Sequence, residues 1–514
     1  MTGHVSIGRD HRGDVVLDTD VVVVGSGAGG AVVAATLAEA GQRVGVLEEG
    51  PHLPLEEYRQ LRQSQHMRRV WRDGGMGVAV GLGGSPMINV TMGRCIGGST
   101  MLAGGVCFRT PERVLDVWSR EMGLSELTAA KLEPCFEQVE RDIHVEEVPT
   151  AMRSRSTQLF GEGARELGFE LKPIRRNTRD CQGCGRCNFG CPHGAKQSTD
   201  LTHLPRALAA GAQVWSDCLV ERIIVEGGRA VGVRGRVLSG RGGLLGRGRG
   251  AKLEVRAARV VLAAGSYYSP LLLMNSGIGR RSRQVGRNMT LHPGFRMFAR
   301  FKEPVRGWRG ALQSAYSDAY EDENITFVGL FIPAGVLAAT MPGFGPELCE
   351  RAKQVPHLAV FGGIIHDEGG GVVRPGPGRE PIVTYRMARR DRATLPRLVR
   401  LMGETFLAAG AEEVFPPVLG QPGLDADGFN QLDIDGLPLT RFECSSQHPL
   451  GTCRMGATPE RSVVDQSGQC WDVEELFVAD GSILPTSLGV NPMLSIMAMA
   501  QRIAWQLCER PLRR

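Results

Sequence analysis

The sequence predicts an α/β protein built on a Rossmann-like dinucleotide-binding domain, and three neighbouring features predict it. Four consecutive valines after Asp20 are typical of a strand buried in a parallel sheet. The glycine pattern G-x-G-x-x-G follows directly and opens a predicted helix that runs to Ala40, where Gly41 caps it. A second apolar strand at 43–49 then contains the acidic Glu48. Strand, turn, helix, strand and acid in this order form a dinucleotide-binding unit.

Each residue of this unit has a predicted physical task. Gly25 permits the tight turn, Gly27 lets the backbone approach a pyrophosphate, and Gly30 lets the helix pack closely. The helix N-terminus favours the negative charge of the pyrophosphate, and Glu48 can accept hydrogen bonds from ribose hydroxyls. The uncharged run at 21–38 has the length of a membrane span, but its glycines argue against one, so we expect no membrane span.

Length and composition predict a large globular protein. The chain has 514 residues, of which 42% are hydrophobic and 22% charged, and this length corresponds to roughly three domains. The net charge of +5 is small, and Arg and Lys are scattered except in the Gly/Arg stretch at 234–250. We expect this stretch to be a flexible surface hairpin and expect no nucleic-acid partner.

Cysteine usage and the N-terminus predict a cytoplasmic location. The 13 cysteines are an odd number spread over a long chain, which argues against a disulfide framework and for a reducing compartment. Residues 1–18 lack the apolar segment of a signal peptide.

Three further stretches indicate which dinucleotide is bound. They are the glycine-rich turn and Pro-initiated helix at 93–118, the stretch GSYYSPLLLMNSGIG at 265–279, and HPLGTCRMG at 448–456 together with 476–504. Together these resemble the glucose-methanol-choline (GMC) family of FAD oxidoreductases over nearly the whole chain. The 265–279 stretch is similar to that family's second signature at every specified position.

The resemblance implies a discontinuous FAD-binding domain with an α+β substrate-binding domain over the flavin. The FAD-binding domain is expected at 18–120, 196–295 and 440–514. A connecting segment is expected at 121–195 and the substrate-binding domain at 296–439, where strand-like runs alternate and a helix is predicted over about 391–409.

A catalytic pair is predicted from the chemistry of alcohol oxidation. When an alcohol gives a hydride to a flavin, its hydroxyl proton must leave, and a histidine suits the role of base near neutral pH. His448 lies in a Pro/Gly-rich turn that suits a presented side chain, and Asn491 precedes Pro492 as the predicted N-cap of an apolar helix. The resemblance implies that His448 is the base and Asn491 its partner. The alternatives are that Asn491 is only a cap and His448 only a turn residue.

The resemblance also implies further cofactor-binding positions. Besides the fingerprint, these are Gly97, Gly98, Ser99, Val220, Asp480, Gly481 and Pro492. For Val220 an ordinary strand valine is an equal alternative, and His292 is expected to be structural. Ala103 stands where many relatives have Asn, so a polar contact is missing there. Some relatives bind FAD covalently through a histidine near this turn, whereas Met101, Leu102 and Ala103 offer none, so we expect non-covalent FAD.

Four cysteines within eleven residues form a second candidate site. Cys181, Cys184, Cys187 and Cys191 are spaced C-x2-C-x2-C-x3-C and are followed by Pro192, which is the spacing of bacterial ferredoxins. We expect an iron-sulfur cluster, and the alternatives are metal-free structural or redox cysteines and a zinc site.

The predicted function is FAD-dependent oxidation of a small-molecule alcohol, with electrons passing through an iron-sulfur cluster to an external acceptor. The alternatives are an oxidase that reduces oxygen to hydrogen peroxide and a hydroxynitrile lyase on the same fold. The stretch at 325–342 is strongly apolar and lies in the expected substrate-binding domain, which favours an apolar alcohol.

Overall fold

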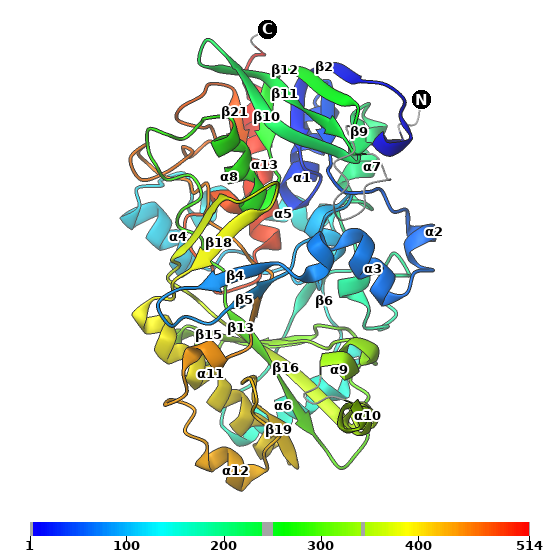
Figure 1. Cartoon of the computed structure of the whole chain (residues 1–514), viewed down its shortest axis with the longest axis vertical. Helices are drawn as coiled ribbons and strands as arrows, with labels where there is room; N and C mark the ends of the chain where they lie inside the picture. The colour runs from blue at the N-terminus through cyan, green and yellow to red at the C-terminus, as the bar shows by residue number, and fades with distance from the viewer. Residues whose placement is uncertain (1–3, 239–249, 341–344, 513–514) are drawn as a thin grey trace.

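The chain folds around two large β-sheets that lie at opposite ends of an elongated molecule (Figure 1). The computed structural model describes residues 4–238, 250–340 and 345–512. Both termini lie at the upper end in Figure 1, beside the first sheet. The segment predicted as a surface hairpin at 234–250 lies mostly outside the described residues, and only its flanking strands can be followed.

The first sheet has eight strands in the order β1-β9-β3-β2-β12-β11-β10, and β21 pairs with β12. The strands are β1 (Ser6–Ile7), β2 (Val15–Val24), β3 (Val44–Leu47), β9 (Gln213–Ser216), β10 (Cys218–Glu226), β11 (Arg229–Val237), β12 (Lys252–Leu262) and β21 (Leu476–Val478). β1, β9, β3, β2 and β12 pair in parallel, whereas β12, β11 and β10 are antiparallel. The four valines that end β2 are buried, so the apolar run is a strand inside a parallel sheet, as predicted.

Helices from distant parts of the chain pack beside this sheet. They are α1 (Ala28–Glu39), α5 (Ala129–Asp142), α7 (His203–Ala209), α8 (Gly265–Asn275) and α13 (Met493–Glu509). α1 contacts α7 and α13, and α13 also contacts α5. The predicted end of the first helix is confirmed, because Ala40 caps α1 and Gly41 follows with a φ of +82°.

The second sheet has eleven strands in the order β17-β18-β4-β5-β20-β13-β16-β15-β14-β7, with β19 paired to β13. The strands are β4 (Val78–Gly81), β5 (Ile88–Val90), β7 (Lys172–Pro173), β13 (Gly294–Arg300), β14 (Ala315–Ser317), β15 (Ile325–Gly329), β16 (Leu358–Ile365), β17 (Gly371–Pro375), β18 (Pro381–Tyr385), β19 (Glu413–Phe415) and β20 (Cys444–Ser446). A separate two-stranded sheet joins β6 (Val145–Glu147) to β8 (Arg175–Asn177).

Two long helices pack against β16 of the second sheet. α6 (Arg155–Glu166) and α11 (Arg389–Ala408) contact this strand and each other. α11 confirms the helix predicted over about 391–409. The remaining α-helices are short: α2 (Leu55–Tyr58), α3 (Gln63–Val70), α4 (Glu112–Asp116), α9 (Ala334–Thr340), α10 (Gly345–Lys353) and α12 (Ala426–Gln431).

Strand pairing ties the two halves of the molecule together. β4, β5 and β20 lie within segments that the sequence assigns to the cofactor domain, yet all three pair in the second sheet. The predicted domain boundaries stay a prediction, but these strands carry the chain across the middle of the molecule. As a result, residues just after β20 lie between the two sheets.

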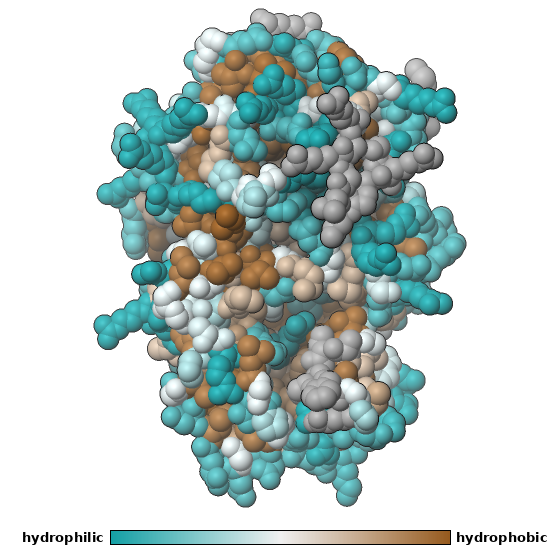
Figure 2. Space-filling model, in the orientation of Figure 1, coloured by the Kyte–Doolittle hydropathy of each residue, from teal (hydrophilic) through white to brown (hydrophobic). Residues whose placement is uncertain are grey.

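The visible surface is mostly hydrophilic, with an apolar patch at mid-height over β4 and β18 (Figure 2). Exposed side chains of these strands include Val80 and Ile382, and exposed Leu82 directly follows β4. Among the described helices, none combines the length and the hydropathy needed to cross a membrane.

A buried arginine fastens the C-terminal segment to the first sheet. Arg259 on β12 is fully buried, and its Nε donates to Glu475 Oε2 at 3.0 Å. Its two other nitrogens donate to the carbonyl oxygens of Leu507, Arg510 and Pro511. These carbonyl groups belong to the last turn of α13 and to the residues after it, where the helix leaves backbone acceptors without partners. One guanidinium therefore satisfies all three.

Replacing this arginine tests its contribution to stability. We expect Arg259→Leu to lower the free energy of unfolding by about 3 kcal/mol, because Glu475 and several carbonyl groups lose their buried partner. Arg256→Leu, on the same strand but exposed, is the matched control and should cost less than about 1 kcal/mol. Denaturant unfolding of both variants measures the difference, and equal losses would contradict the assignment.

Candidate active site

A cavity of about 730 Å³ lies at the carboxyl ends of the parallel strands of the first sheet. The structure brings most of the predicted cofactor-binding residues to its wall: Gly25, Gly27, Glu48, Gly98, Ser99, Val220, Asp480, Gly481 and Pro492. Ligands of open α/β sheets bind at this edge of the sheet. The position of the cavity is therefore that expected for a dinucleotide.

Two predicted glycines lie behind this wall rather than on it. A Cβ on Gly30 would lie 2.0 Å from the carbonyl oxygen of Gly25, so Gly30 serves the close packing that the sequence predicted. Gly97 has a φ of +88° and packs against the side chain of Asp200. Both therefore shape the turns that line the cavity.

The turn before α1 packs backbone to backbone against two other segments. A Cβ on Gly25, whose φ is +104°, would lie 2.3 Å from the carbonyl oxygen of Ala263. A Cβ on Gly98 would lie 2.8 Å from the Cα of Gly27. Nothing beyond Gly98 crowds Gly27, which leaves the cavity side of this turn open for a phosphate group at the N-terminus of α1.

Glu48 joins the end of β3 to the glycine turn. Its Oε2 accepts from the backbone N–H and the hydroxyl of Ser26, at 3.1 and 2.7 Å, and its Oε1 accepts from the N–H of Gly50 at 2.8 Å. Burial raises the pKa of Glu48, while these donors oppose the rise. Oε1 accepts only one of these bonds and can accept another, so the predicted contact with a ribose hydroxyl is compatible with them.

Asp480, which follows β21, connects the C-terminal part of the cavity wall to α8. Its Oδ1 accepts from the N–H of Ser482 at 2.8 Å, and its Oδ2 accepts from the N–H of Gly265 at 2.9 Å and from the hydroxyl of Ser269. The 265–279 stretch therefore serves in part to hold Asp480. Its glycine and its serine satisfy a carboxylate whose pKa is raised by burial.

A second cavity, of about 250 Å³, adjoins the first and lies between the two sheets. His448 and Pro492 line both cavities, and Asn491 lines the second. The walls of the second cavity are largely apolar: Leu102, Val106, Phe295, Leu312, Val328, Leu330, Phe331, Ile332 and Ile364. Part of the apolar 325–342 stretch therefore faces this cavity.

His448 and Asn491 meet in this second cavity. Asn491 Nδ2 lies 3.1 Å from His448 Nε2. The prediction that Asn491 caps the following helix is wrong, because Pro492 occupies the cap position of α13 and the helix begins at Met493. The proline moves the start of the helix one residue onward and leaves the Asn491 amide free to face His448.

A second histidine, expected to be structural, completes this group. His292 is fully buried, and its Nε2 accepts from the N–H groups of Leu488 and Gly489 at 2.9 and 3.2 Å. Neutral His292 therefore carries its proton on Nδ1, which lies 3.2 Å from His448 Nδ1. This bond places the proton of neutral His448 on Nε2. If the side-chain amide of Asn491 is flipped, its Oδ1, which otherwise has no partner, takes the place of Nδ2 and accepts the N–H of His448 Nε2.

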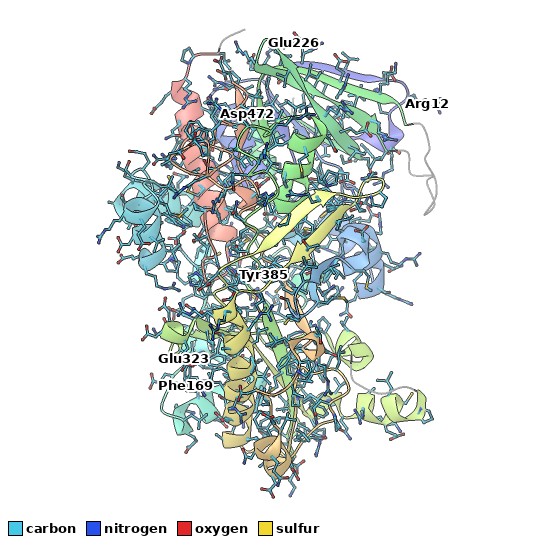
Figure 3. The ribbon with its side chains drawn as sticks, turned by 60° about the vertical axis from the view of Figure 1, so that its left-hand side comes forward. Arg12, Phe169, Glu226, Glu323, Tyr385 and Asp472 are labelled. Atoms are coloured by element: carbon cyan, nitrogen blue, oxygen red, sulfur yellow. The ribbon has the colours of Figure 1, made fainter. Side chains whose placement is uncertain are left out.

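Buried polar groups hold His292 in place. Asp367 accepts from the N–H groups of Leu291 and His292, both at 3.0 Å, and from the hydroxyl of Tyr385 at 2.7 Å. Tyr385 ends β18 of the second sheet and lies at mid-height in the molecule (Figure 3). His292 has a φ of +48°, an unusual backbone conformation that these bonds stabilise.

The surroundings keep both histidines neutral. Burial lowers the pKa of His448 to about 4 and the pKa of His292 well below its ordinary value of 6.5. Protonated His448 would also direct an N–H toward the N–H of His292. His448 is therefore uncharged near neutral pH.

The four cysteines of the ferredoxin-like stretch surround one small cavity. Cys184 donates a hydrogen bond to Cys191, which lowers the pKa of Cys191 to about 5. Within residues 4–238, 250–340 and 345–512, no three side chains of His, Cys, Asp or Glu are arranged to hold a metal ion. The iron-sulfur ligand set therefore stays a prediction.

Two buried cations lie against these cysteines. Arg176 donates to Cys187 Sγ at 3.0 Å and to the carbonyl oxygen of Gly104. Lys196 donates to the carbonyl oxygens of Met101, Ala103 and Cys187. Burial lowers the pKa of Lys196 to about 8. Both cations thus join the cysteine stretch to the loop at 101–104, which borders the second cavity.

Arg176, Lys196 and Asp367 are not among the site residues predicted from the sequence. A charged residue in a mostly apolar or glycine-rich stretch could have drawn attention to Lys196. No local pattern marks Asp367, because its partners are distant in the sequence.

Comparisons with known proteins agree with this architecture. The GMC oxidoreductase family matches the chain over residues 19–294 with its N-terminal model and over 375–500 with its C-terminal model. A GMC-type oxidoreductase of Mycobacterium tuberculosis is 38% identical over 497 residues, which cover 96% of this chain and 76% of the relative. A long-chain-alcohol oxidase of Arabidopsis thaliana is 29% identical, covering 97% and 70%.

A solved structure shows the same fold. Pyridoxine 4-oxidase from Mesorbium loti superposes with a TM-score of 0.72 at 21% identity, over 96% of this chain and 100% of that one. The predicted α/β architecture, a Rossmann-like FAD-binding domain with an α+β domain over the flavin, is confirmed. The chain belongs to the GMC oxidoreductase family.

Proposed function

We propose that this protein oxidises an alcohol with FAD as the hydride acceptor, and that His448 and Asn491 are its catalytic pair. The observation that carries the proposal is the meeting of these two side chains in a cavity that adjoins the dinucleotide cavity. A hydroxyl group beside His448 would lie next to the place where the two cavities join. The name of the Arabidopsis relative, a long-chain-alcohol oxidase, supports the same reaction class.

FAD would be held non-covalently by the residues around the larger cavity. Gly27 and the N-terminus of α1 suit the pyrophosphate, Glu48 the ribose, and Asp480 with Gly481 the ribityl region. When bound, FAD accepts a hydride from the alcohol carbon. The turn at 101–103 has no histidine side chain for a covalent bond.

His448 would take the hydroxyl proton. Its pKa of about 4 leaves it neutral, so one of its two ring nitrogens carries no proton. In the arrangement described above, His292 occupies Nδ1 and the proton resides on Nε2. Nε2 could accept the substrate proton only if the proton of His448 first moved to Nδ1, and the hydrogen bond from His292 Nδ1 would then have to break. His292 would therefore influence which nitrogen of His448 can act as the base.

The four cysteines are proposed to hold an iron-sulfur cluster that carries electrons to an external acceptor. Four thiols around one cavity are the donor set of such a cluster, and the buried charges of Arg176 and Lys196 would offset its negative charge. Leu312 lines both this cavity and the second cavity, so the cysteine stretch adjoins the proposed substrate site. The alternative is an oxidase that gives its electrons to oxygen.

Removal of the base tests the reaction. We expect His448→Ala to slow the reduction of bound flavin by an alcohol by about 100- to 10,000-fold, the usual contribution of a positioned base. Anaerobic stopped-flow absorbance measures this rate. FAD released by acid should be equal in both proteins, and His11→Ala, which alters an exposed histidine, should behave like wild type. Reduction of the His448 variant at the wild-type rate would show that another group takes the proton.

The pH dependence follows from the lowered pKa of His448. We expect the rate of flavin reduction at saturating alcohol to stay level from about pH 6 upward and to fall as the pH approaches 4, because protonation removes the accepting lone pair. Rates measured from pH 4 to 9 at constant FAD content test this. An inflection near pH 6.5 would indicate a solvent-accessible base instead.

Metal analysis tests the cysteine site. Protein purified without oxygen should contain about four iron and four acid-labile sulfide atoms per chain. Cys184→Ser should lower both contents, whereas Cys508→Ser, at an exposed cysteine elsewhere, should not. Zinc without iron, or no metal at all, would contradict the cluster and leave the alcohol chemistry of His448 untouched.

A further inference from the structure

The second cavity contains a cationic side chain that the proposed reaction does not use. Arg296 lies on β13 and lines the same cavity as His448 and Asn491, but not the larger dinucleotide cavity. Its side chain is open to the cavity, and the surrounding protein lowers its pKa from the ordinary value of 12.5 through burial. Arg296 is therefore a cation whose exposed side chain lines the second cavity.

Arg296 has no hydrogen-bond or ion-pair partner in the part of the chain that the structure describes. Glu443 acts on it through space but does not form an ion pair with it. Arg300, four residues along the same strand, instead pairs with Glu413 at 3.0 Å and with Glu412. The guanidinium donors of Arg296 therefore remain available in a cavity with largely apolar walls, and they can bind an anionic group there.

The rest of the cavity limits what this anionic group can be attached to. No acidic side chain and no second Arg or Lys is found among the described residues that line it, and the two histidines are neutral. The walls suit an alkyl chain. One guanidinium matches the two oxygens of a carboxylate, and the nearby charge of Glu443 favours a monoanion over a phosphate dianion.

We propose that Arg296 binds the carboxylate of a hydroxy acid whose hydroxyl group and carboxylate are separated by an apolar chain. This inference rests on the proposed function, because it places the hydroxyl group beside His448. The substrate class is then an apolar hydroxy fatty acid rather than a neutral alcohol, and Arg296 determines that specificity.

Three probes separate recognition of the carboxylate from the chemistry: 8-hydroxyoctanoate, its methyl ester, and octanoate. Octanoate has no hydroxyl group to oxidise, so its binding to the FAD-loaded enzyme, followed by the change in flavin absorbance, reports on the carboxylate site alone. The ester keeps the hydroxyl group and the chain but lacks the charge. Wild-type protein should bind 8-hydroxyoctanoate at least about 10-fold more tightly than the ester.

The variant Arg296→Met removes the charge and keeps an unbranched side chain in the cavity. We expect it to raise the Kd of octanoate and of 8-hydroxyoctanoate by about 10- to 100-fold, as when a charge-assisted pair is lost. The Kd of the ester and the rate of flavin reduction at saturating ester should stay nearly unchanged. Arg300→Met, the matched control on the same strand, should bind all three probes like wild type.

Equal affinity of wild-type protein for the acid and the ester would overturn the proposal. An equal loss of affinity for 8-hydroxyoctanoate and for its methyl ester in Arg296→Met would also overturn it. Octanoate binding that depends on Arg296, in an enzyme whose flavin no alcohol reduces, would support the carboxylate site and defeat the proposed oxidation instead.

Discussion

The close backbone packing of the turn before α1 is the constraint on which the rest of the site depends. Gly29 shows it most clearly, because a Cβ there would lie 1.6 Å from the carbonyl oxygen of Ala479. Gly25 approaches Ala263 in the same way, and Gly98 approaches Gly27. Segments hundreds of residues apart thus meet around one helix N-terminus. Because these glycines have no side chains, the segments around residues 98, 263 and 479 pack against the turn and form one continuous wall for a dinucleotide.

Buried polar groups connect the wall of the larger cavity to the histidines of the second cavity. Asp480 is held by α8, and the segment that follows it supplies the N–H groups of residues 488 and 489 that fix the ring of His292. His292 then determines which nitrogen of His448 carries the proton. Because burial keeps both rings neutral, their roles depend on hydrogen-bond direction rather than on charge. One segment of the chain thus connects an aspartate in the wall of the larger cavity to a histidine in the wall of the second cavity.

Three cationic side chains lie at the smaller cavity or beside it, and their partners differ. Lys196 and Arg176 are satisfied by carbonyl oxygens and by a cysteine sulfur, so they stabilise the loop between the cysteines and the cavity. Arg296 has no such partner among the described residues. The first pair therefore contributes to the structure of the site, whereas Arg296 retains the capacity to bind a ligand.

The sequence by itself determined the dinucleotide-binding unit, because β2, the turn and α1 arise from contacts between neighbours in the chain. It also indicated His448 and Asn491, since a presented histidine and an asparagine before a proline are local patterns. Only the tertiary structure decided that His292 contacts His448, because 156 residues separate them. It alone also gave the environment of Arg296, which in the sequence is one of two arginines in an otherwise apolar strand. Side-chain direction and burial depend on packing between distant segments, and no local pattern encodes them.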